Sequence, residues 1–373
     1  MESLLVDAPM PPPGMAEVAA LAADALAFHR SLASYRPTPL HALPELAAHL
    51  GVGTLQLKDE SPRFGLNAFK GLGASFAVAH WIATHPGTAI PTFTTATDGN
   101  HGRAVAWSAR RAGARAVVFI PAHASSPRID AIRREGAEVV LVKDGYDAAV
   151  RMAHEAASAR GWVLIQDTAW AGYEAIPNWI AAGYWTSARE LEPDPHGADS
   201  GVDLVLLHAG VGTWAAAMTS YYWHRYGAAR PRLVVVEPVD APCLIRAAPG
   251  GVPIGLEITR HTVMAGLDCG LASTTALATL RRSVDAFITI EDRWALEAMR
   301  CLASPAGEDP VLVAGESGAA SVGALLALTN ESAFDAVRAH LGLDATTRVL
   351  AWLTEGATDP GHWAEVVGRP APA

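Results

Sequence analysis

The sequence predicts an α/β protein built from parallel sheets. Three observations lead to this prediction: short apolar runs alternate with helical patterns, half of the 373 residues are hydrophobic, and glycine-rich loops fall between apolar runs and helices. Such alternation is typical of βαβ units, whose strands pair in parallel. Because ligands in open parallel sheets bind beyond the carboxyl ends of the strands, the loops after the strands are where we expect a site.

The first series of elements opens with an apolar helix expected at residues 74–83. Strands are then expected at residues 92–95, 116–120, 139–142 and 162–165, and helices at 103–111, 127–135 and 147–160. The strand segments are rich in valine, threonine, isoleucine and aromatic residues, which favour extended backbone. The order therefore predicts a small parallel sheet with helices between its strands.

A second series predicts a larger sheet. Its strands are expected at residues 204–207, 233–237, 286–290 and 349–353, and its helices at 214–226, 294–302, 317–328 and 334–340. Breaks near residue 64 and at 192–203 indicate that a small α/β domain, residues 65–189, is inserted into a large domain made of residues 1–64 and 190–373. Residues 1–14 and 370–373 are expected to be a loose arm and a loose tail.

Composition excludes several classes of protein. The net charge is −10 and no dense basic cluster is present, so nucleic-acid binding is not expected. No uncharged apolar run of about 18 residues occurs, and the N-terminus is not a signal peptide, so a soluble, cytoplasmic protein with no membrane contact is expected. Cys243, Cys269 and Cys301 lack metal-site spacing, and no metal is predicted. Cys243 and Cys269 could pair if the fold brings them together.

Lys70 is an unusual residue in this chain, which contains only three lysines against twenty-five arginines. It stands in FGLNAFKGLG (residues 64–73), directly before an apolar helix, where the helix dipole disfavours a cation. One interpretation is an amine whose pKa burial lowers until it can attack a carbonyl. The alternative is a lysine whose apolar stem lies on the protein surface with its charge in water.

Two glycine-containing loops lie between an expected strand and a helix. In TDGNHG (residues 97–102) backbone N–H groups at a helix start could bind a carboxylate, or the segment could be a simple turn. In AGVGT (residues 209–213) two glycines and a hydroxyl suit a phosphate, although glycine there could also serve close helix packing. The spacing matches neither a dinucleotide fingerprint nor a P-loop, so a nucleotide is not expected.

Two further loops place polar residues at the ends of expected strands. QDTAW (residues 166–170) contributes Asp167, and TEG (residues 354–356) follows the last strand. Each could instead be a helix cap or an ordinary turn. Taken together, a desolvated lysine, an anion loop, a phosphate loop and carboxylates at one sheet edge suit a cofactor with an aldehyde and a phosphate. Pyridoxal 5′-phosphate, bound by Lys70 as a Schiff base, is that cofactor.

These motifs resemble those of the fold-type II pyridoxal-phosphate enzymes (tryptophan synthase β-like), and more narrowly those of the diaminopropionate ammonia-lyase family. The similarity extends from about Tyr35 to Asp359. NAFK (residues 67–70) and DTAW (167–170) are much more specific than the glycine loops. MAGL (264–267) and GESG (315–318) extend the resemblance. It implies a fold of two open parallel-sheet domains.

The resemblance also implies a set of cofactor contacts. Lys70 would form the Schiff base, Asn100 would hydrogen-bond the cofactor's 3′-oxygen, and Thr354 would face its pyridine nitrogen. The phosphate would be bound by the loop of Gly210, Val211, Gly212 and Thr213.

The implied reaction is α,β-elimination from 2,3-diaminopropionate, a small amino acid, giving pyruvate and ammonia. Asp98 and Asp167 would be the catalytic carboxylates that remove the Cα proton on opposite faces, which would explain acceptance of both D and L isomers. The substrate carboxylate would be held by the backbone of Gly99, Asn100, His101 and Gly102. A homodimer is expected from the family.

Several residues depart from the family pattern. Gly71, Ala171 and Trp214 stand where we expect a bulkier residue, a glutamate and a smaller residue, respectively. Ala171 and Trp214 bear on the pocket, so two alternatives stay open on the same scaffold: a serine/threonine dehydratase and a β-replacement synthase. A third alternative, from another class, is a catalytically silent amino-acid or anion-binding protein.

Overall fold

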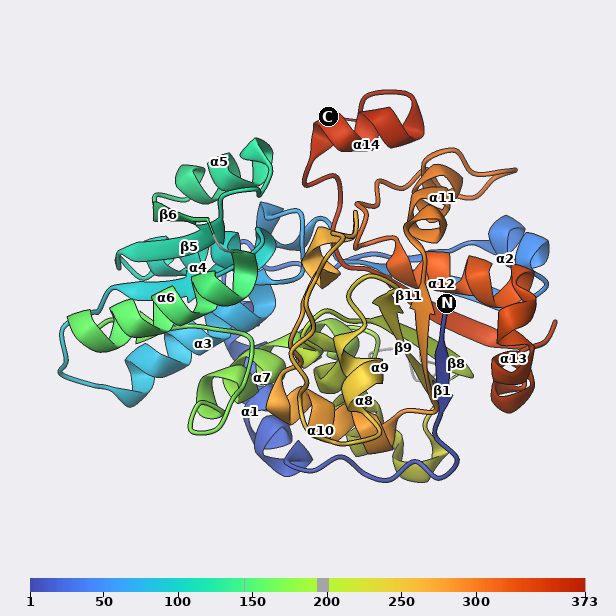
Figure 1. Cartoon of the computed structure of the whole chain (residues 1–373), viewed down its shortest axis with the longest axis horizontal. Coiled ribbons are helices and arrows are strands. Elements are labelled where there is room, and N and C mark those ends of the chain that lie inside the picture. The colour runs from blue at the N-terminus through green and yellow to red at the C-terminus, as the bar shows by residue number, and fades with distance from the viewer. Residues whose placement is uncertain (144, 193–200, 373) are drawn as a thin grey trace.

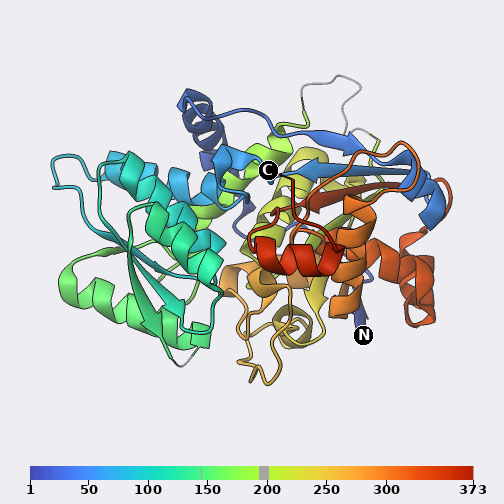
Figure 2. The ribbon, with the colours of Figure 1, turned by 90° about the horizontal axis from the view of Figure 1, so that it is seen from above.

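A computed structural model of the chain describes residues 1–143, 145–192 and 201–372. It contains two β-sheets, each flanked by helices, which lie side by side (Figures 1 and 2). The smaller sheet and its helices form the cyan and green part of both views. No helix in the described part of the chain is both long enough and apolar enough to cross a membrane.

The larger sheet has seven strands in the order β1-β10-β9-β8-β11-β3-β2. Its five inner strands run parallel, and the two short edge strands, β1 and β2, are antiparallel to their neighbours. The strands are β1 (Ser3–Leu5), β2 (Leu40–Ala42), β3 (Thr54–Asp59), β8 (Leu204–His208), β9 (Arg232–Pro238), β10 (Ala286–Ile290) and β11 (Arg348–Leu353).

The smaller sheet has four parallel strands in the order β6-β5-β4-β7. They are β4 (Phe93–Ala96), β5 (Ala116–Pro121), β6 (Glu138–Val142) and β7 (Val163–Leu164). These strands fall inside the small domain predicted from the sequence. The domain boundaries themselves stay a prediction, and much of the predicted break at residues 192–203 lies outside the described residues.

Helices connect and cover the strands (Figure 1). They are α1 (Met15–Ser31), α2 (Pro44–Leu50), α3 (Gly71–Thr84), α4 (Asn100–Arg111), α5 (Ser126–Arg134), α6 (Gly145–Arg160), α7 (Ala175–Arg189), α8 (Thr213–Tyr226), α9 (Cys243–Ala247), α10 (Thr274–Ser283), α11 (Asp292–Ala303), α12 (Ala320–Asn330), α13 (Asp335–Leu341) and α14 (Pro360–Val367). Four 3₁₀ turns are η1 (Arg63–Gly65), η2 (Gly227–Ala229), η3 (Ala265–Leu267) and η4 (Ser332–Phe334).

The inner strands of each sheet are buried on both faces, which explains the apolar runs in the sequence. In β8, Val205 and Leu207 pack with α8 and α10, whereas Leu204 and Leu206 pack with α11 and α12 on the other face. In β5, alternate residues likewise divide between two cores, one shared with α4 and the other with α6. Because successive side chains point to opposite faces, a strand covered on both sides must be apolar throughout.

Every strand predicted from the sequence is present, within one or two residues at its ends, and three further strands, β1, β2 and β3, were not predicted. Residues 1–14 are not a loose arm, because β1 pairs antiparallel with β10 and covers that edge of the large sheet. β2 and β3 were also missed. β3 lies beside β11 in the sheet, although its sequence alternates apolar Leu55 and Leu57 with polar residues.

Two helix starts differ from the prediction in ways that affect the site. α4 begins at Asn100 rather than at residue 103, so the Asn100 and His101 side chains lie in its first turn. α12 begins at Ala320 rather than at residue 317, because the preceding turn packs against the strand end of β11. A Cβ atom on Gly318 would overlap the carbonyl oxygen of Glu355, so only glycine permits this approach.

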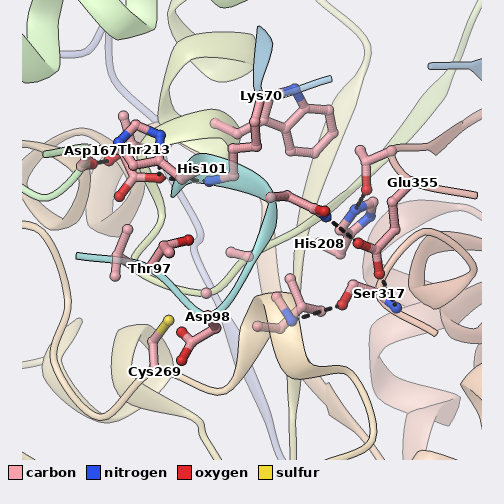
Figure 3. Close-up of a pocket in the computed structure, with 18 of the residues that line it drawn as sticks. Lys70, Thr97, Asp98, His101, Asp167, His208, Thr213, Cys269, Ser317 and Glu355 are labelled. Carbon is pink, nitrogen blue, oxygen red and sulfur yellow. Dashed lines mark hydrogen bonds and ion pairs between the residues drawn. The ribbon is translucent and has the colours of Figure 1, made fainter. Parts of the chain in front are cut away.

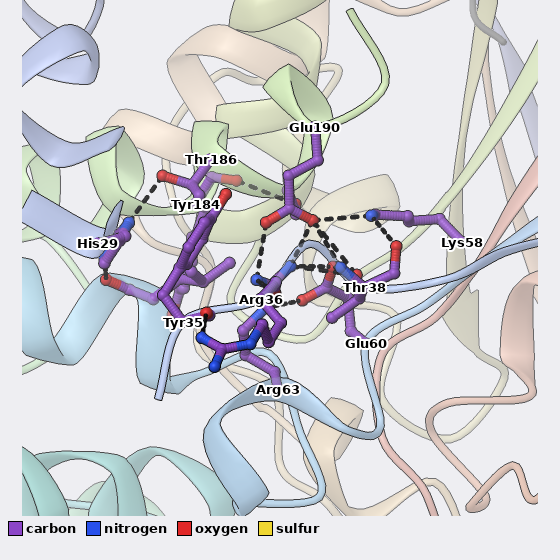
Figure 4. Close-up of polar contacts among 12 residues, drawn as sticks. His29, Tyr35, Arg36, Thr38, Lys58, Glu60, Arg63, Tyr184, Thr186 and Glu190 are labelled. Carbon is purple, nitrogen blue, oxygen red and sulfur yellow. Dashed lines mark hydrogen bonds and ion pairs between the residues drawn. The ribbon is translucent and has the colours of Figure 1, made fainter. Parts of the chain in front are cut away.

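Four charged side chains form a buried cluster at the end of β3, which we call the buried charge cluster: Lys58, Glu60, Arg63 and Glu190 (Figure 4). Glu190 follows α7, and its two oxygens lie 2.8 Å from Lys58 Nζ and 2.7 Å from Arg63 Nη1. Arg63 also pairs with Glu60 at 2.8 Å. Hydrogen bonds from Arg63 and Lys58 lower the pKa of Glu190, although burial opposes its charge.

Candidate active site

A pocket with about 810 Å³ of empty space, part of it open to solvent, lies where the strand ends of the two sheets meet. Its size suits a small-molecule site. It is lined by the loops after β4, β7, β8 and β11 and by the segment before α3. Every site residue predicted from the sequence lines this pocket except Gly99 and Gly102.

Lys70 lies at the N-cap of α3 with its amine in the pocket (Figure 3). The segment before it is joined to the end of β11 by two backbone hydrogen bonds. The Phe69 N–H donates to the Thr354 carbonyl, and the Gly356 N–H donates to the Asn67 carbonyl, both at 3.0 Å. Lys70 and Thr354 are therefore held together by backbone contacts of the large sheet.

The Lys70 amine pairs with Asp167, which corrects one expectation from the sequence. Lys70 Nζ lies 2.6 Å from Asp167 Oδ2. Burial alone would lower the pKa of Lys70, but the Asp167 carboxylate outweighs it and raises that pKa. The same pairing lowers the pKa of Asp167 to about 2 against the effect of burial. In this state Lys70 is a paired ammonium, and the expected lowering of its pKa was wrong.

His101 faces the same carboxylate. Its Nε2 lies 2.8 Å from the Ile165 carbonyl, so the proton of the neutral ring belongs on Nε2, which donates there. Nδ1 lies 3.7 Å from Asp167 Oδ2 and has no hydrogen-bond partner among the described residues. Burial, together with the charge of Lys70, lowers the pKa of His101. His101 therefore presents an unprotonated nitrogen to Asp167.

Asp98 lies apart from the Lys70–Asp167 pair, beside Cys269 (Figure 3). Burial raises the pKa of the Cys269 thiol, and the charges of Asp98 and Asp167 raise it further. Cys243 and Cys269 are both buried and free in the structure, so they do not pair. The Cys243 thiol donates to the Gly210 carbonyl at 3.5 Å.

The loop of residues 97–102 offers fewer anion donors than the sequence suggested. Thr97 Oγ1 accepts the N–H groups of Gly99, at 2.9 Å, and of Gly102, at 3.0 Å. The backbone N–H groups of Asn100 and His101 have no acceptor among the described residues. These two amides, at the start of α4, are the ones able to bind a carboxylate. Thr97, which sequence reasoning passed over, fixes the loop.

The loop between β8 and α8 is a second site for an anion. The N–H groups of Gly210, Val211 and Gly212 have no acceptor in the described part of the chain, and they precede the first turn of α8. Gly212 has φ of 97°, and a Cβ atom there would lie 3.1 Å from Leu244 and Ala276. The Thr213 hydroxyl donates to the Asp167 carbonyl, so it is not the free donor that the sequence suggested.

Two polar pairs line the pocket near β11. His208, the last residue of β8, has Nε2 2.6 Å from Thr354 Oγ1, and burial with the Lys70 charge lowers the pKa of His208 to about 3. The Asn100 amide donates to Glu355. Burial raises the pKa of Glu355. His208 ends the apolar strand β8, and Glu355 is the second residue after the apolar strand β11. The rule that ligands bind at the carboxyl ends of parallel strands, which identified Asp167, therefore applies to both. Cys269 and Tyr146 also line the pocket, but no local sequence pattern indicates them.

The chain is similar over most of its length to known proteins. Residues 32–338 match the family described as pyridoxal-phosphate dependent enzyme. The diaminopropionate ammonia-lyase of Salmonella typhimurium is 41% identical over 93% of this chain and 92% of its own. That of Escherichia coli K12 is 39% identical over 91% and 89%.

The chain belongs to the diaminopropionate ammonia-lyase family. A crystal structure of the Escherichia coli member, in complex with an aminoacrylate–PLP azomethine reaction intermediate, superimposes with a TM-score of 0.91 at 37% identity. The superposition covers 98% of this chain and 96% of the Escherichia coli chain. The predicted fold-type II architecture is thereby confirmed.

The residues present fit the pyridoxal phosphate of this family. The amides at residues 210–212, which have no acceptor in the described part of the chain, and the start of α8 are suited to bind a phosphate. A side chain at Gly212 would be strained by its φ of 97° and would crowd Leu244 and Ala276. Lys70 supplies an amine, and Asn100 and Thr354 place an amide and a hydroxyl on the pocket wall. The cofactor predicted from the sequence is thus the one that the family uses.

Proposed function

We propose that this protein eliminates ammonia from both D- and L-2,3-diaminopropionate and forms, with one water, pyruvate and two molecules of ammonia. The observation that carries the proposal is a pair of carboxylates, Asp98 and Asp167, placed at different parts of one pocket that also contains Lys70. The Cα–H bonds of two enantiomers point in opposite directions, and one base cannot easily reach both.

We assign the cofactor contacts as follows. Lys70 would bind the aldehyde carbon through its amine, and the loop of Gly210–Thr213 would bind the phosphate through backbone N–H groups. Asn100 would donate to the 3′-oxygen, and Thr354 would contact the pyridine nitrogen. When bound, pyridoxal phosphate withdraws electrons from the substrate's α-carbon.

The chain's own residues then position the substrate and move its protons. The amides of Asn100 and His101 bind the substrate carboxylate. Asp167, whose Oδ2 atom lies 2.6 Å from Lys70 Nζ, would accept the Cα proton of one enantiomer. His101 Nδ1 is an acceptor beside that oxygen, and it would accept a hydrogen bond from Asp167 once Asp167 has taken the proton. Asp98 serves the opposite enantiomer.

The β-amine departs only if it is protonated, because amide ion is a poor leaving group. Lys70 Nζ, an aspartate and the cofactor phosphate are the available acids. We further expect a homodimer, as the resemblance implies. The composition predicts a cytoplasmic location, and the breaks in the sequence pattern predict that residues 65–189 form the smaller domain. Size-exclusion chromatography with light scattering measures the assembly.

The direct test is to incubate the purified protein with each enantiomer and to measure pyruvate. No pyruvate from either isomer, with cofactor bound, would refute the proposal. A panel of serine and threonine, with and without added nucleophiles, identifies a dehydratase or a β-replacement synthase instead.

The division of labour between the two carboxylates has its own test. We expect Asp98→Asn and Asp167→Asn each to lower kcat/KM for one enantiomer by at least about tenfold more than for the other, since a missing general base costs roughly 10²–10⁴-fold. Equal losses for both isomers in both variants would show that the carboxylates do not act on separate faces.

A further inference from the structure

Glu355 connects three segments of the chain at the edge of the pocket (Figure 3). Its side chain is buried, with only 2% of the residue exposed. Oε2 accepts from the side-chain amide of Asn100, at the start of α4, and Oε1 accepts the Ser317 N–H at 3.2 Å. The carboxyl group thus links a helix of the small sheet to the large sheet.

The backbone holds Glu355 in this place. Glu355 forms an antiparallel bridge with Ala68, two residues before Lys70, and its carbonyl accepts the Gly315 N–H at 2.9 Å. The turn of residues 315–318 approaches closely because Gly318 has no side chain. These contacts with Ala68 and with the turn of residues 315–318 fix the position of the Glu355 backbone. The Glu355 carboxyl group therefore orients the Asn100 side chain, rather than the reverse.

The hydrogen bonds of Asn100 show what this arrangement does. A carboxamide nitrogen carries two hydrogens, and its oxygen only accepts. One hydrogen of Asn100 Nδ2 goes to Glu355, and the second has no acceptor among the described residues although Asn100 lines the pocket. If the amide turned over, its oxygen would face the Glu355 carboxylate and repel it. Glu355 therefore selects the orientation in which nitrogen, not oxygen, occupies this position.

We propose that Glu355 is a positioning residue that fixes the Asn100 amide so that it donates, through its second N–H, to the 3′-oxygen of the cofactor. The inference rests on the proposed cofactor contacts. It gives the GESG segment (residues 315–318) a role as well, because that turn supplies the second hydrogen bond to Glu355.

Glu316 provides a matched control. It is also a glutamate with 2% exposure, one residue away from Ser317, and its carboxylate pairs with His362 and lies 4.0 Å from Arg128. Within the described part of the chain, Glu316 is not among the residues that line the pocket, and it forms no hydrogen bond with Asn100. Replacing either glutamate removes a buried carboxylate, but only the replacement of Glu355 removes the acceptor of the Asn100 hydrogen bond.

The experiment titrates cofactor-free protein with pyridoxal 5′-phosphate and records the half-saturating concentration and the visible absorption band. We expect Glu355→Ala to raise that concentration about tenfold, the effect of one lost hydrogen bond. The band should also shift, because a hydrogen bond to the 3′-oxygen favours its ionised form. Glu316→Ala should change both readouts much less than Glu355→Ala does, because Glu316 acts on Glu355 only through its charge, and it should lower the thermal midpoint.

A double-mutant cycle tests whether Glu355 acts through Asn100. The variant with both Glu355→Ala and Asn100→Ala should bind the cofactor no more weakly than Asn100→Ala alone. Should Glu355→Ala not fold, Glu355→Gln replaces it in the cycle, since Asn100 and Ser317 donate to different oxygens of Glu355 and glutamine has an acceptor at only one of these two positions.

The outcomes separate this inference from the proposed function. A wild-type protein that binds no cofactor would refute the proposed function itself. A wild type that binds, with Glu355 variants that bind equally well and show the same band, would refute the role of Glu355 alone. Fully additive effects in the cycle would do the same.

Discussion

The buried charge cluster and the active-site pocket both hold a lysine and carboxylates away from bulk water, but they differ in how completely their polar atoms are paired (Figures 3 and 4). In the cluster, Lys58 donates to Glu190 and to a carbonyl, and each Arg63 nitrogen has an acceptor. In the pocket, the Nδ1 atoms of His101 and His208 have no partner among the described residues. Complete pairing stabilises a fold, whereas unpaired groups are available to a ligand.

The two lysines allow the largest test of this contrast. We expect Lys70→Ala to remove the covalent cofactor band and to lower kcat by at least about 10³-fold, as loss of a covalent catalyst does. Absorption spectra and pyruvate formation measure both effects. Lys58→Ala is the matched control: it should lower the free energy of unfolding and leave the cofactor band in place. A Lys70→Ala protein that keeps the band would contradict the assignment.

Breaking the cluster should act on stability. Glu190→Gln leaves Lys58 and Arg63 buried with too little negative charge, and we expect it to lower the free energy of unfolding by about 3–5 kcal/mol. Urea denaturation measures this quantity. Glu192→Gln, two residues away in a more exposed pair with Arg189, should cost less than about 1 kcal/mol. Similar losses in both variants would argue against a special role for the buried cluster.

The pairing of Asp167 predicts a pH dependence of stability. Its pKa is lowered in the folded protein to about 2. A carboxyl with a lowered pKa stabilises the fold while ionised, so its contribution is complete above about pH 4 and disappears as the pH falls through 2. Between pH 4 and pH 2, the unfolding free energy of the cofactor-free wild type should fall by roughly 2 kcal/mol more than that of the cofactor-free Asp167→Asn variant. Asp130→Asn, in an exposed pair on α5, should change the slope less.

The smallest expected effect concerns the substrate loop. Thr97→Val removes the oxygen that accepts the Gly99 and Gly102 N–H groups, so the loop should lose its shape. We expect KM for diaminopropionate to rise about tenfold, the effect of a misplaced pair of hydrogen bonds. Steady-state kinetics measure it. Thr97→Ser retains the oxygen and should behave as the wild type; if it fails equally, packing of the methyl group is the cause.

Much of the fold and the position of the site followed from local sequence patterns. Strands buried on both faces are apolar throughout, and parallel strands carry their ligands at their carboxyl ends, so Asp98, Asp167 and Thr354 could each be placed at a strand end. The expectation of one shared sheet edge was wrong, because β4 and β7 belong to the small sheet and β11 to the large sheet. β1 and β3 could not be found in this way. β3 has few apolar residues. Lys58, near its end, is buried although it is charged, because it forms an ion pair with Glu190.

The state of Lys70 could not be predicted from its neighbours in the chain. Phe69, Gly71 and Leu72 suggest an amine whose pKa falls through burial. The residue that reverses the sign is Asp167, which is 97 positions away and reaches Lys70 only through the fold. The Glu355–Asn100 contact joins residues 255 positions apart in the same way. Contacts at that separation leave no local pattern in the sequence.

The strand order of the large sheet also determines when the protein can fold. β11 lies between β8 and β3 near the middle of the sheet, yet it is the last strand in the chain, at residues 348–353. β1, the first strand, pairs only with β10, at residues 286–290. The large sheet cannot form all of its strand pairs until almost the whole chain has left the ribosome. The last of the four strands of the small sheet, in contrast, ends at residue 164. Translation therefore exposes the unpaired edges of β3 and β8 for longest, and these edges are where we expect chaperones to be needed.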